Sequence, residues 1–359
     1  MGKYWQLLAE HRFRIHPLRW PMTFLGTGCA VMNSLLRPIQ DFAYGRTIAN
    51  SELVAPPVFI VGHWRSGTTL MHELLTLDDR VASATTLDAV TPHHLLVSKT
   101  LLGPIVNLLL PKKRPMDNMS FAGTSPQEDD FALLSLGAPT LYRQIAFPNE
   151  RQLNALNLDP ELLTLEQRNQ LRDSLCYFYR VLTARYKRPL VLKSPPHTAR
   201  LASLDRWFPG AKFIHISRHP YRLVSSTLHL WRSLDDTQGF QIPKYSDDEL
   251  MEYIHRCSKE MYRAYFRDRS QISASRLVEV QFEQLVADPV NTMQDVLDRL
   301  EWPNADRLLA QIENYFEKRR EYNPVSRSPE SAVQSEVDLR WQEYMEAFQY
   351  QLSASSASR

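Results

Sequence analysis

A short loop around position 65 has the residue types and the spacing of an anion-binding site. The segment GHWRSGTTL begins at Gly62 and nearly matches the phosphate-binding pattern GxxxxGK[ST], since Gly67 has the right spacing and Thr69 stands where a metal-binding hydroxyl would be. Thr68 occupies the position of the usual lysine, and a positive charge stands three residues earlier, at Arg65. The pattern therefore predicts an anionic ligand held by arginine rather than by lysine.

The chemistry of this loop favours an anion bound without a metal ion. Successive backbone N–H groups at a helix N-terminus attract anions, and the fork of donors on Arg65 adds charge. A nucleoside triphosphate site would also need an acid at the end of an apolar strand to hold Mg²⁺. The candidate strands end in KSPP, SRHP and FEQL instead. A sulfuryl group fits such a loop, because it carries one negative charge where a phosphoryl group carries two.

A second anion site is indicated by the segment RHPYRLVSS, residues 218–226. Arg218 follows an apolar strand pattern, and Ser226 lies eight residues later, two turns into the helix that follows. Arg222 and Ser226 are four residues apart and share a helix face. A guanidinium and a hydroxyl would thus surround another anion, so the ligand is expected to be a nucleotide with phosphates at both ends.

The elements that position these residues follow a repeated pattern of strand, turn and helix. It occurs at residues 55–62, 188–196, 211–220 and 275–289, which predicts an α/β protein: a P-loop-like parallel β-sheet flanked by helices on both faces. About a hundred residues between the first two strands read as a large helical insertion, and the apolar spacing at 163–189 predicts an amphipathic helix. Because ligands bind beyond the carboxyl ends of parallel strands, Arg65, Lys193 and Arg218 are expected to share one site.

The two ends of the chain are predicted to differ from its centre. Residues 1–50 read as an N-terminal helical segment, residues 51–350 as the α/β domain and residues 351–359 as a flexible tail. The apolar stretch 21–36 is too interrupted for a membrane-spanning helix. A buried amphipathic helix is the favoured interpretation, with peripheral membrane contact as the alternative; the apolar stretch 101–111 raises the same question.

Composition narrows the classes of function. The chain of 359 residues has a net charge of only +2, which gives no electrostatic reason to expect nucleic acid as a partner. Its three cysteines lie far apart and form neither a disulfide framework nor a zinc-binding pattern, so a reducing compartment, and hence a cytoplasmic location, is expected.

At this point the residues carry a family resemblance. The loop 62–70 resembles the 5′-phosphosulfate loop of the sulfotransferases that use 3′-phosphoadenosine 5′-phosphosulfate (PAPS), and RHPYRLVSS resembles their 3′-phosphate motif. Arginine in the first loop is the form of the Golgi-type and many bacterial members. The resemblance extends over about residues 57–289, and the two motifs together are much more specific than either alone.

The resemblance implies an enzyme that transfers a sulfuryl group from PAPS to a hydroxyl or amine of a small-molecule, lipid or glycan acceptor by in-line displacement, with no metal. Lys193 would stabilise the leaving phosphate, and Phe282, which replaces a family tyrosine, would retain an apolar contact to adenine. The remaining implied ligands are those of the 5′-phosphosulfate, Arg65, Ser66, Gly67, Thr68 and Thr69, and those of the 3′-phosphate, Arg218 and Ser226.

The general base is left with several candidates. Pro195 stands where the cytosolic branch has its catalytic histidine, and His197 follows two residues later. His197 is the first candidate, because imidazole titrates near neutral pH. Glu128 is the second, although its spacing from Ser125 also fits a helix capping box. The pair His93 and His94 comes third, with a surface position as the alternative.

Two other functions remain open at this stage. A metal-dependent P-loop kinase would require magnesium and bind ATP, and a non-catalytic nucleotide-binding protein would bind nucleotide without transferring a group.

Overall fold

The computed structural model describes residues 2–98, 123–154, 156–318 and 331–351. Within them the chain divides into two compact units. The first unit comprises residues 1–55, 80–192 and 230–249, and the second comprises residues 56–79, 193–229 and 250–359. The apolar stretch 101–111 and nearly all of the predicted tail 351–359 lie outside the described residues. The predicted domain boundaries stay a prediction.

The second unit holds the sheet. Its strands are β1 (Val58–Val61), β2 (Val191–Lys193, which spans the unit boundary), β3 (Lys212–Ser217) and β4 (Leu277–Gln281), in the order β2-β1-β3-β4. β1 pairs with β3 and β3 pairs with β4 in parallel register. All residues of β1 are buried, as expected for a strand covered on both faces. The α/β fold class and the four predicted strands are confirmed.

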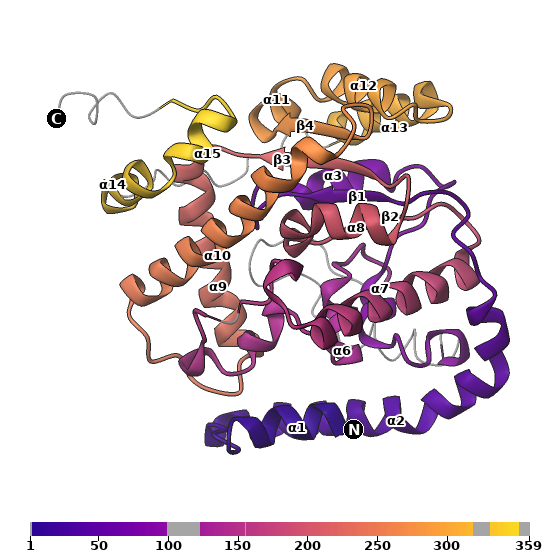
Figure 1. The fold of residues 1–359 in the computed structure, drawn as a ribbon, viewed down its shortest axis with the longest axis vertical. Helices are drawn as coiled ribbons and strands as arrows, with labels where there is room; N and C mark the ends of the chain where they lie inside the picture. The colour runs from indigo at the N-terminus through magenta and orange to yellow at the C-terminus, as the bar shows by residue number, and fades with distance from the viewer. Residues whose placement is uncertain (1, 99–122, 155, 319–330, 352–359) are drawn as a thin grey trace. The chain divides into compact units, whose positions relative to one another are not determined.

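Helices follow the strands of this unit, as the sequence pattern predicted. Figure 1 shows α11, α12 and α13 gathered beside β4. Pro220 is the first residue of α9, where its missing N–H and fixed φ suit a helix start. The elements are α3 (Thr68–Leu75), η5 (Pro195–Arg200), α8 (Leu201–Trp207), α9 (Pro220–Gln238), α10 (Asp247–Asp268), η6 (Arg269–Gln271), α11 (Phe282–Ala287), α12 (Pro289–Arg299), α13 (Ala305–Glu317), α14 (Ser331–Arg340) and α15 (Gln342–Ala347); of these, α9 and α10 span the unit boundary.

The first unit is mainly helical. The amphipathic helix predicted at 163–189 is α7 (Leu165–Tyr186), and the four apolar residues that predicted it, Leu171, Leu175, Phe178 and Leu182, are fully buried. The other elements are α1 (Gly2–Glu10), η1 (Pro17–Arg19), α2 (Trp20–Ala49), α4 (Thr86–Val90), α6 (Asp130–Leu136), η2 (Leu141–Ile145), η3 (Pro148–Glu150) and η4 (Pro160–Leu162). The predicted insertion is thus helical where it is described.

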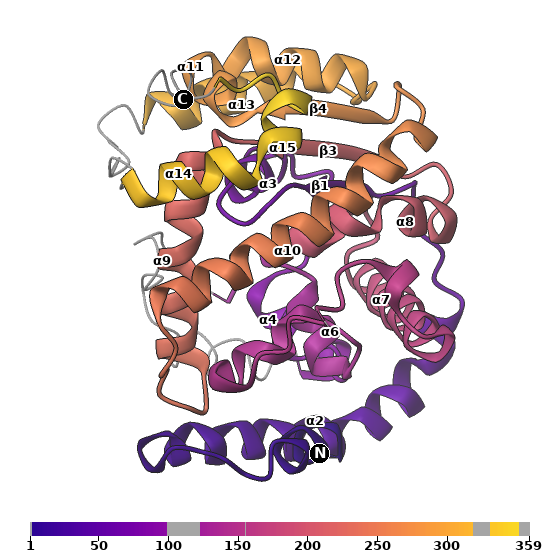
Figure 2. The ribbon, with the colours of Figure 1, turned by 60° about the vertical axis from the view of Figure 1, so that its left-hand side comes forward.

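The N-terminal helices of this unit correct one expectation. α1 and α2 lie side by side in both views, and Tyr4 Oη donates to Thr23 O at 2.9 Å (Figures 1 and 2). The apolar stretch 21–36 is helical, but its burial was predicted wrongly. Thr23 and Ala30 face the protein, whereas Phe24 and Leu35 are exposed. The larger apolar side chains therefore point outward.

Candidate functional site

The loop 62–69 connects β1 to α3 and has an unusual backbone. Gly62 and Gly67 have φ values of 141° and 109°, and Arg65 has a φ of 66°. Glycine tolerates positive φ, whereas an arginine there is uncommon and costs conformational energy. Gly62 N donates to Thr198 Oγ1 at 2.7 Å, and α3 starts at Thr68 with Gly67 as its N-cap. The loop therefore presents a helix N-terminus beyond the end of a buried strand.

The two predicted anion sites meet in the second unit. Arg65 Nε donates to Ser226 Oγ at 2.9 Å, and Arg218 Nη1 donates to the Arg65 carbonyl at 2.8 Å. Burial, and then the charge of Arg65, lower the pKa of Arg218. The positive charges of the two arginines therefore repel each other, and an anion bound beside both would relieve that repulsion. The arginines that the sequence placed at separate strand ends thus lie in one site.

Two buried polar atoms at this site have no hydrogen-bond partner. They are Ser66 Oγ, in a side chain that is completely buried, and Arg218 Nε. An unpaired buried donor is costly, and such atoms in native proteins often mark the position of a ligand. The loop and the Arg218 side chain therefore fit an anion with several acceptor oxygens.

Phe282 links the two parts of the site. The Arg218 guanidinium lies 4.5 Å from the centre of the Phe282 ring, a cation–π geometry. The same ring packs against Gly67, where an added Cβ would lie 2.3 Å from Phe282 Cδ2. Gly67 is therefore required for its φ and also for the space that Phe282 occupies.

The strand end of β2 supplies Lys193, which is buried. His197 follows in η5; it is also buried, and its Nδ1 is 3.2 Å from Arg200 Nη1. The residues that were predicted at the strand ends are therefore present in the second unit, and the catalytic role of His197 stays a prediction.

A support for Arg218 was missed by the sequence analysis. Arg218 N donates to Tyr344 Oη at 3.0 Å, and the same hydroxyl donates to Arg218 O at 3.0 Å. Next to it, Tyr350 Oη donates to Glu283 Oε2 at 3.0 Å, and Glu283 Oε1 accepts from His219 N at 3.0 Å. Tyr344 is thus a positioning residue for Arg218. Its only sequence signal was the dense aromatic pattern of residues 341–350, which does not identify a partner.

A second support lies inside the loop itself. His63 is fully buried, its Nδ1 is 2.9 Å from Trp64 O, and its Nε2 is 2.8 Å from Ser258 Oγ in α10. Burial lowers the pKa of His63 to about 4, so the ring is neutral near pH 7. A neutral imidazole can donate from Nδ1 and accept at Nε2, which ties the loop to α10.

The other base candidates belong to the first unit. Glu128 accepts a hydrogen bond from the Tyr142 hydroxyl. The capping box considered for Ser125 and Glu128 does not form, because α6 begins at Asp130. His94 is buried rather than at the surface, and burial lowers its pKa to about 4. The catalytic role of Glu128 stays a prediction.

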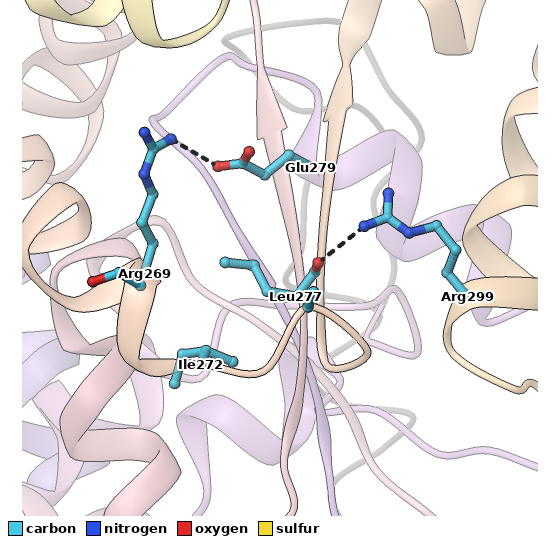
Figure 3. Close-up of a pocket in the computed structure, with 7 residues that line it drawn as sticks. Arg269, Ile272, Leu277, Glu279 and Arg299 are labelled. Carbon is cyan, nitrogen blue, oxygen red and sulfur yellow. Dashed lines mark hydrogen bonds and ion pairs between the residues drawn. The ribbon is translucent and has the colours of Figure 1, made fainter.

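A cavity of about 450 Å³ lies elsewhere on the second unit (Figure 3). It is at the N-terminal end of β4, whereas the anion site is at the carboxyl ends of the strands. Its two arginines make hydrogen bonds: Arg269 Nη1 to Glu279 Oε1 at 3.3 Å, and Arg299 Nη2 to Leu277 O at 3.4 Å. We assign this cavity no part in the chemistry.

A parallel sheet, a glycine loop at a helix N-terminus and two arginines at the strand ends are the features of a P-loop-like α/β protein with a candidate anion site. The model of the Sulfotransferase family matches residues 56–306, so the chain belongs to the sulfotransferase family. It is an enzyme that transfers a sulfuryl group.

A relative supports the family assignment, and two solved structures share the fold. The chain is 33% identical to omega-hydroxy-beta-dihydromenaquinone-9 sulfotransferase Stf3 of Mycobacterium bovis over 96% of this chain and 88% of the relative. The fold is similar to that of sulfotransferase STF9 from Mycobacterium avium, with a TM-score of 0.69, 17% identity and coverage of 94% of this chain and 88% of the other. It is also similar to that of STF1 from Mycobacterium tuberculosis, with a TM-score of 0.61, 15% identity and coverage of 86% and 84%.

Proposed function

We propose that the sulfuryl donor is PAPS and that it binds across the two arginines. The contact between Arg218 and the Arg65 carbonyl supports this proposal most directly. It joins the loop proposed for the 5′-phosphosulfate to the arginine proposed for the 3′-phosphate. Arg65 and residues 66–69 would hold the 5′-phosphosulfate. Arg218 and Ser226 would hold the 3′-phosphate, and Phe282 would contact the adenine.

The reaction is in-line displacement, in which positioning and electrostatics supply most of the rate. The donor supplies an activated sulfuryl group. Arg65 and Lys193 stabilise the negative charge that develops on the bridging oxygen while the S–O bond breaks. The acceptor hydroxyl loses its proton to a base, for which His197 and Glu128 are the two candidates.

We infer that the acceptor is a lipid with a terminal hydroxyl. The support is the similarity to Stf3, whose name gives a hydroxylated menaquinone derivative as its acceptor. The glycan and other small-molecule acceptors expected from the family have no comparable support.

Donor binding is tested by thermal unfolding with two ligands. Adenosine 3′,5′-bisphosphate should raise the Tm in EDTA, because the proposed ligands are side chains and backbone N–H groups only. ATP with Mg²⁺ should raise it much less. Stabilisation by ATP that requires Mg²⁺ would instead support metal-dependent phosphoryl transfer.

The base is tested by comparing Glu128→Gln with His197→Asn. Both variants keep hydrogen-bonding capacity but remove a proton acceptor. The variant that lacks the true base should lose at least about tenfold in kcat, and the acidic limb should disappear from its pH–rate profile. Its affinity for the bisphosphate should be unchanged. If both variants keep wild-type profiles, neither residue is the base.

A further inference from the structure

The helix α2 in the first unit exposes large apolar side chains and buries a polar one. A helix that covers a core does the reverse. Its exposed side chains include Phe24 at 68%, Leu35 at 67% and Phe42 at 94% relative accessibility. Its buried side chains include the polar Gln40, which donates to Tyr177 Oη at 3.0 Å. Exposed apolar residues scattered singly are normal, whereas several large ones aligned on one helix face mark an interaction surface.

The exposed residues form one stripe. Phe24, Leu35, Ile39 and Phe42 recur at spacings that keep them on one face of a helix, and all four are exposed. Eighteen residues separate the first from the last, which is about 27 Å at the rise of an α-helix. We call this set of four residues the α2 stripe.

Further exposed apolar residues extend the surface at the N-terminal end of α2. Leu18 and Trp20 are exposed, and the Trp20 ring is 5.6 Å from that of Phe24. Trp5 and Phe13 are also exposed, with their rings 5.9 Å apart. Tryptophan is enriched where protein meets the headgroup region of a bilayer.

The charge of this segment is unlike that of the rest of the chain. Residues 1–50 contain six Lys or Arg and two Asp or Glu, a net charge of +4, whereas the whole chain has +2. Of the two acids, Glu10 is paired with Arg143 and Asp41 with Arg37. Arg46 is exposed and falls on the same helix face as the α2 stripe. The apolar surface is therefore accompanied by positive charge.

We propose that the α2 stripe docks on an anionic lipid surface with the helix axis parallel to the membrane plane. An apolar face with cations beside it fits the acyl–headgroup boundary of anionic lipid. A second copy fits less well, because two segments of +4 would then face each other. No helix in the described ranges is long and apolar enough to cross a membrane. The proposal concerns a surface and does not rest on the donor or acceptor proposed above.

The test is co-sedimentation of the full chain with vesicles of phosphatidylcholine alone or with 30–40% phosphatidylglycerol (roughly the anionic range that attracts basic segments). The wild type should bind the anionic vesicles, and salt should weaken binding. The triple variant Phe24→Ser, Leu35→Ser, Phe42→Ser should bind at least about tenfold more weakly. The matched control, Leu162→Ser, Leu165→Ser, Leu339→Ser, replaces three exposed leucines elsewhere and should bind like the wild type.

Two results would overturn the proposal. One is equal binding of the wild type and the triple variant to anionic vesicles. The other is a wild-type dimer without lipid that the triple variant converts to a monomer, since the stripe would then serve self-association. If the triple variant unfolds at the wild-type Tm, its weaker binding to vesicles is not caused by misfolding. Affinity for adenosine 3′,5′-bisphosphate should also be unchanged, so failure of the donor proposal would be seen separately.

Discussion

Replacement of Tyr344 by phenylalanine removes one oxygen and both of its hydrogen bonds to the backbone of Arg218. Each bond contributes about 0.5–1.5 kcal/mol net, so the variant should lose about 1–3 kcal/mol of the interactions that hold Arg218 in place. If that loss falls on the donor-bound state, affinity for adenosine 3′,5′-bisphosphate should fall between about fivefold and 150-fold. The kcat should change by less than about threefold, because the hydroxyl bonds to Arg218 and not to the loop.

The assay is isothermal titration with adenosine 3′,5′-bisphosphate, together with initial rates at varied donor concentration. Tyr265→Phe is the matched control. It removes a hydroxyl from the same aromatic cluster, where Tyr265 donates to Glu279 Oε1 at 2.6 Å and lies 6.1 Å from Tyr262. Both variants should lower the Tm, and only Tyr344→Phe should weaken bisphosphate binding. Equal bisphosphate affinity in the two variants would refute the positioning role of Tyr344.

Three other changes have defined outcomes. Arg65→Ala should reduce kcat by about 10²–10³, the effect of losing one donor that stabilises transition-state charge; an undiminished initial rate would contradict its role. Gly67→Ala should lower the Tm by several degrees because its Cβ would lie 2.3 Å from the Phe282 ring; Phe282→Ala should restore part of the loss in the double variant, and no restoration would show that φ alone is responsible. Burial lowers the pKa of His63 in the folded protein to about 4, against 6.5 for an unperturbed group, so the unfolded chain binds more protons between these values. The free energy of unfolding should therefore decrease as the pH is lowered from 6.5 towards 4, by up to about 3 kcal/mol. Urea unfolding at pH 5 and pH 7.5 should show a smaller difference for His63→Gln than for the wild type, and identical differences would exclude His63 as a cause.

The convergence of the candidate site residues was largely predictable because their motifs are local. Each combines an apolar strand with a turn and a helix start, and parallel strands bring their carboxyl ends to one edge. Arg65 and Arg218 could therefore be expected to share a site although 153 residues separate them. Their direct contact could not be predicted, because it depends on the positive φ of Arg65 and on side-chain rotamers.

The supports of the site were not predictable from the sequence. Tyr344 reaches Arg218 across 126 residues, and His63 reaches Ser258 across 195. Neither pair has a fixed spacing, because such pairings are set by tertiary packing. The burial of the apolar stretch 21–36 was predicted wrongly for a related reason: apolar periodicity identifies a helix face but does not say whether protein covers that face.

The hydrogen bond between Arg65 and Ser226 has a consequence for ligand discrimination. Under the proposed function, the side chains that serve opposite ends of the nucleotide hold each other before it arrives. A compound with one phosphate must break that hydrogen bond and gives a new partner to only one of the two side chains. A bisphosphate gives a new partner to both. Preference for the doubly phosphorylated nucleotide would then come from the hydrogen bond between these two side chains. It would need no group that repels a nucleotide with a single phosphate.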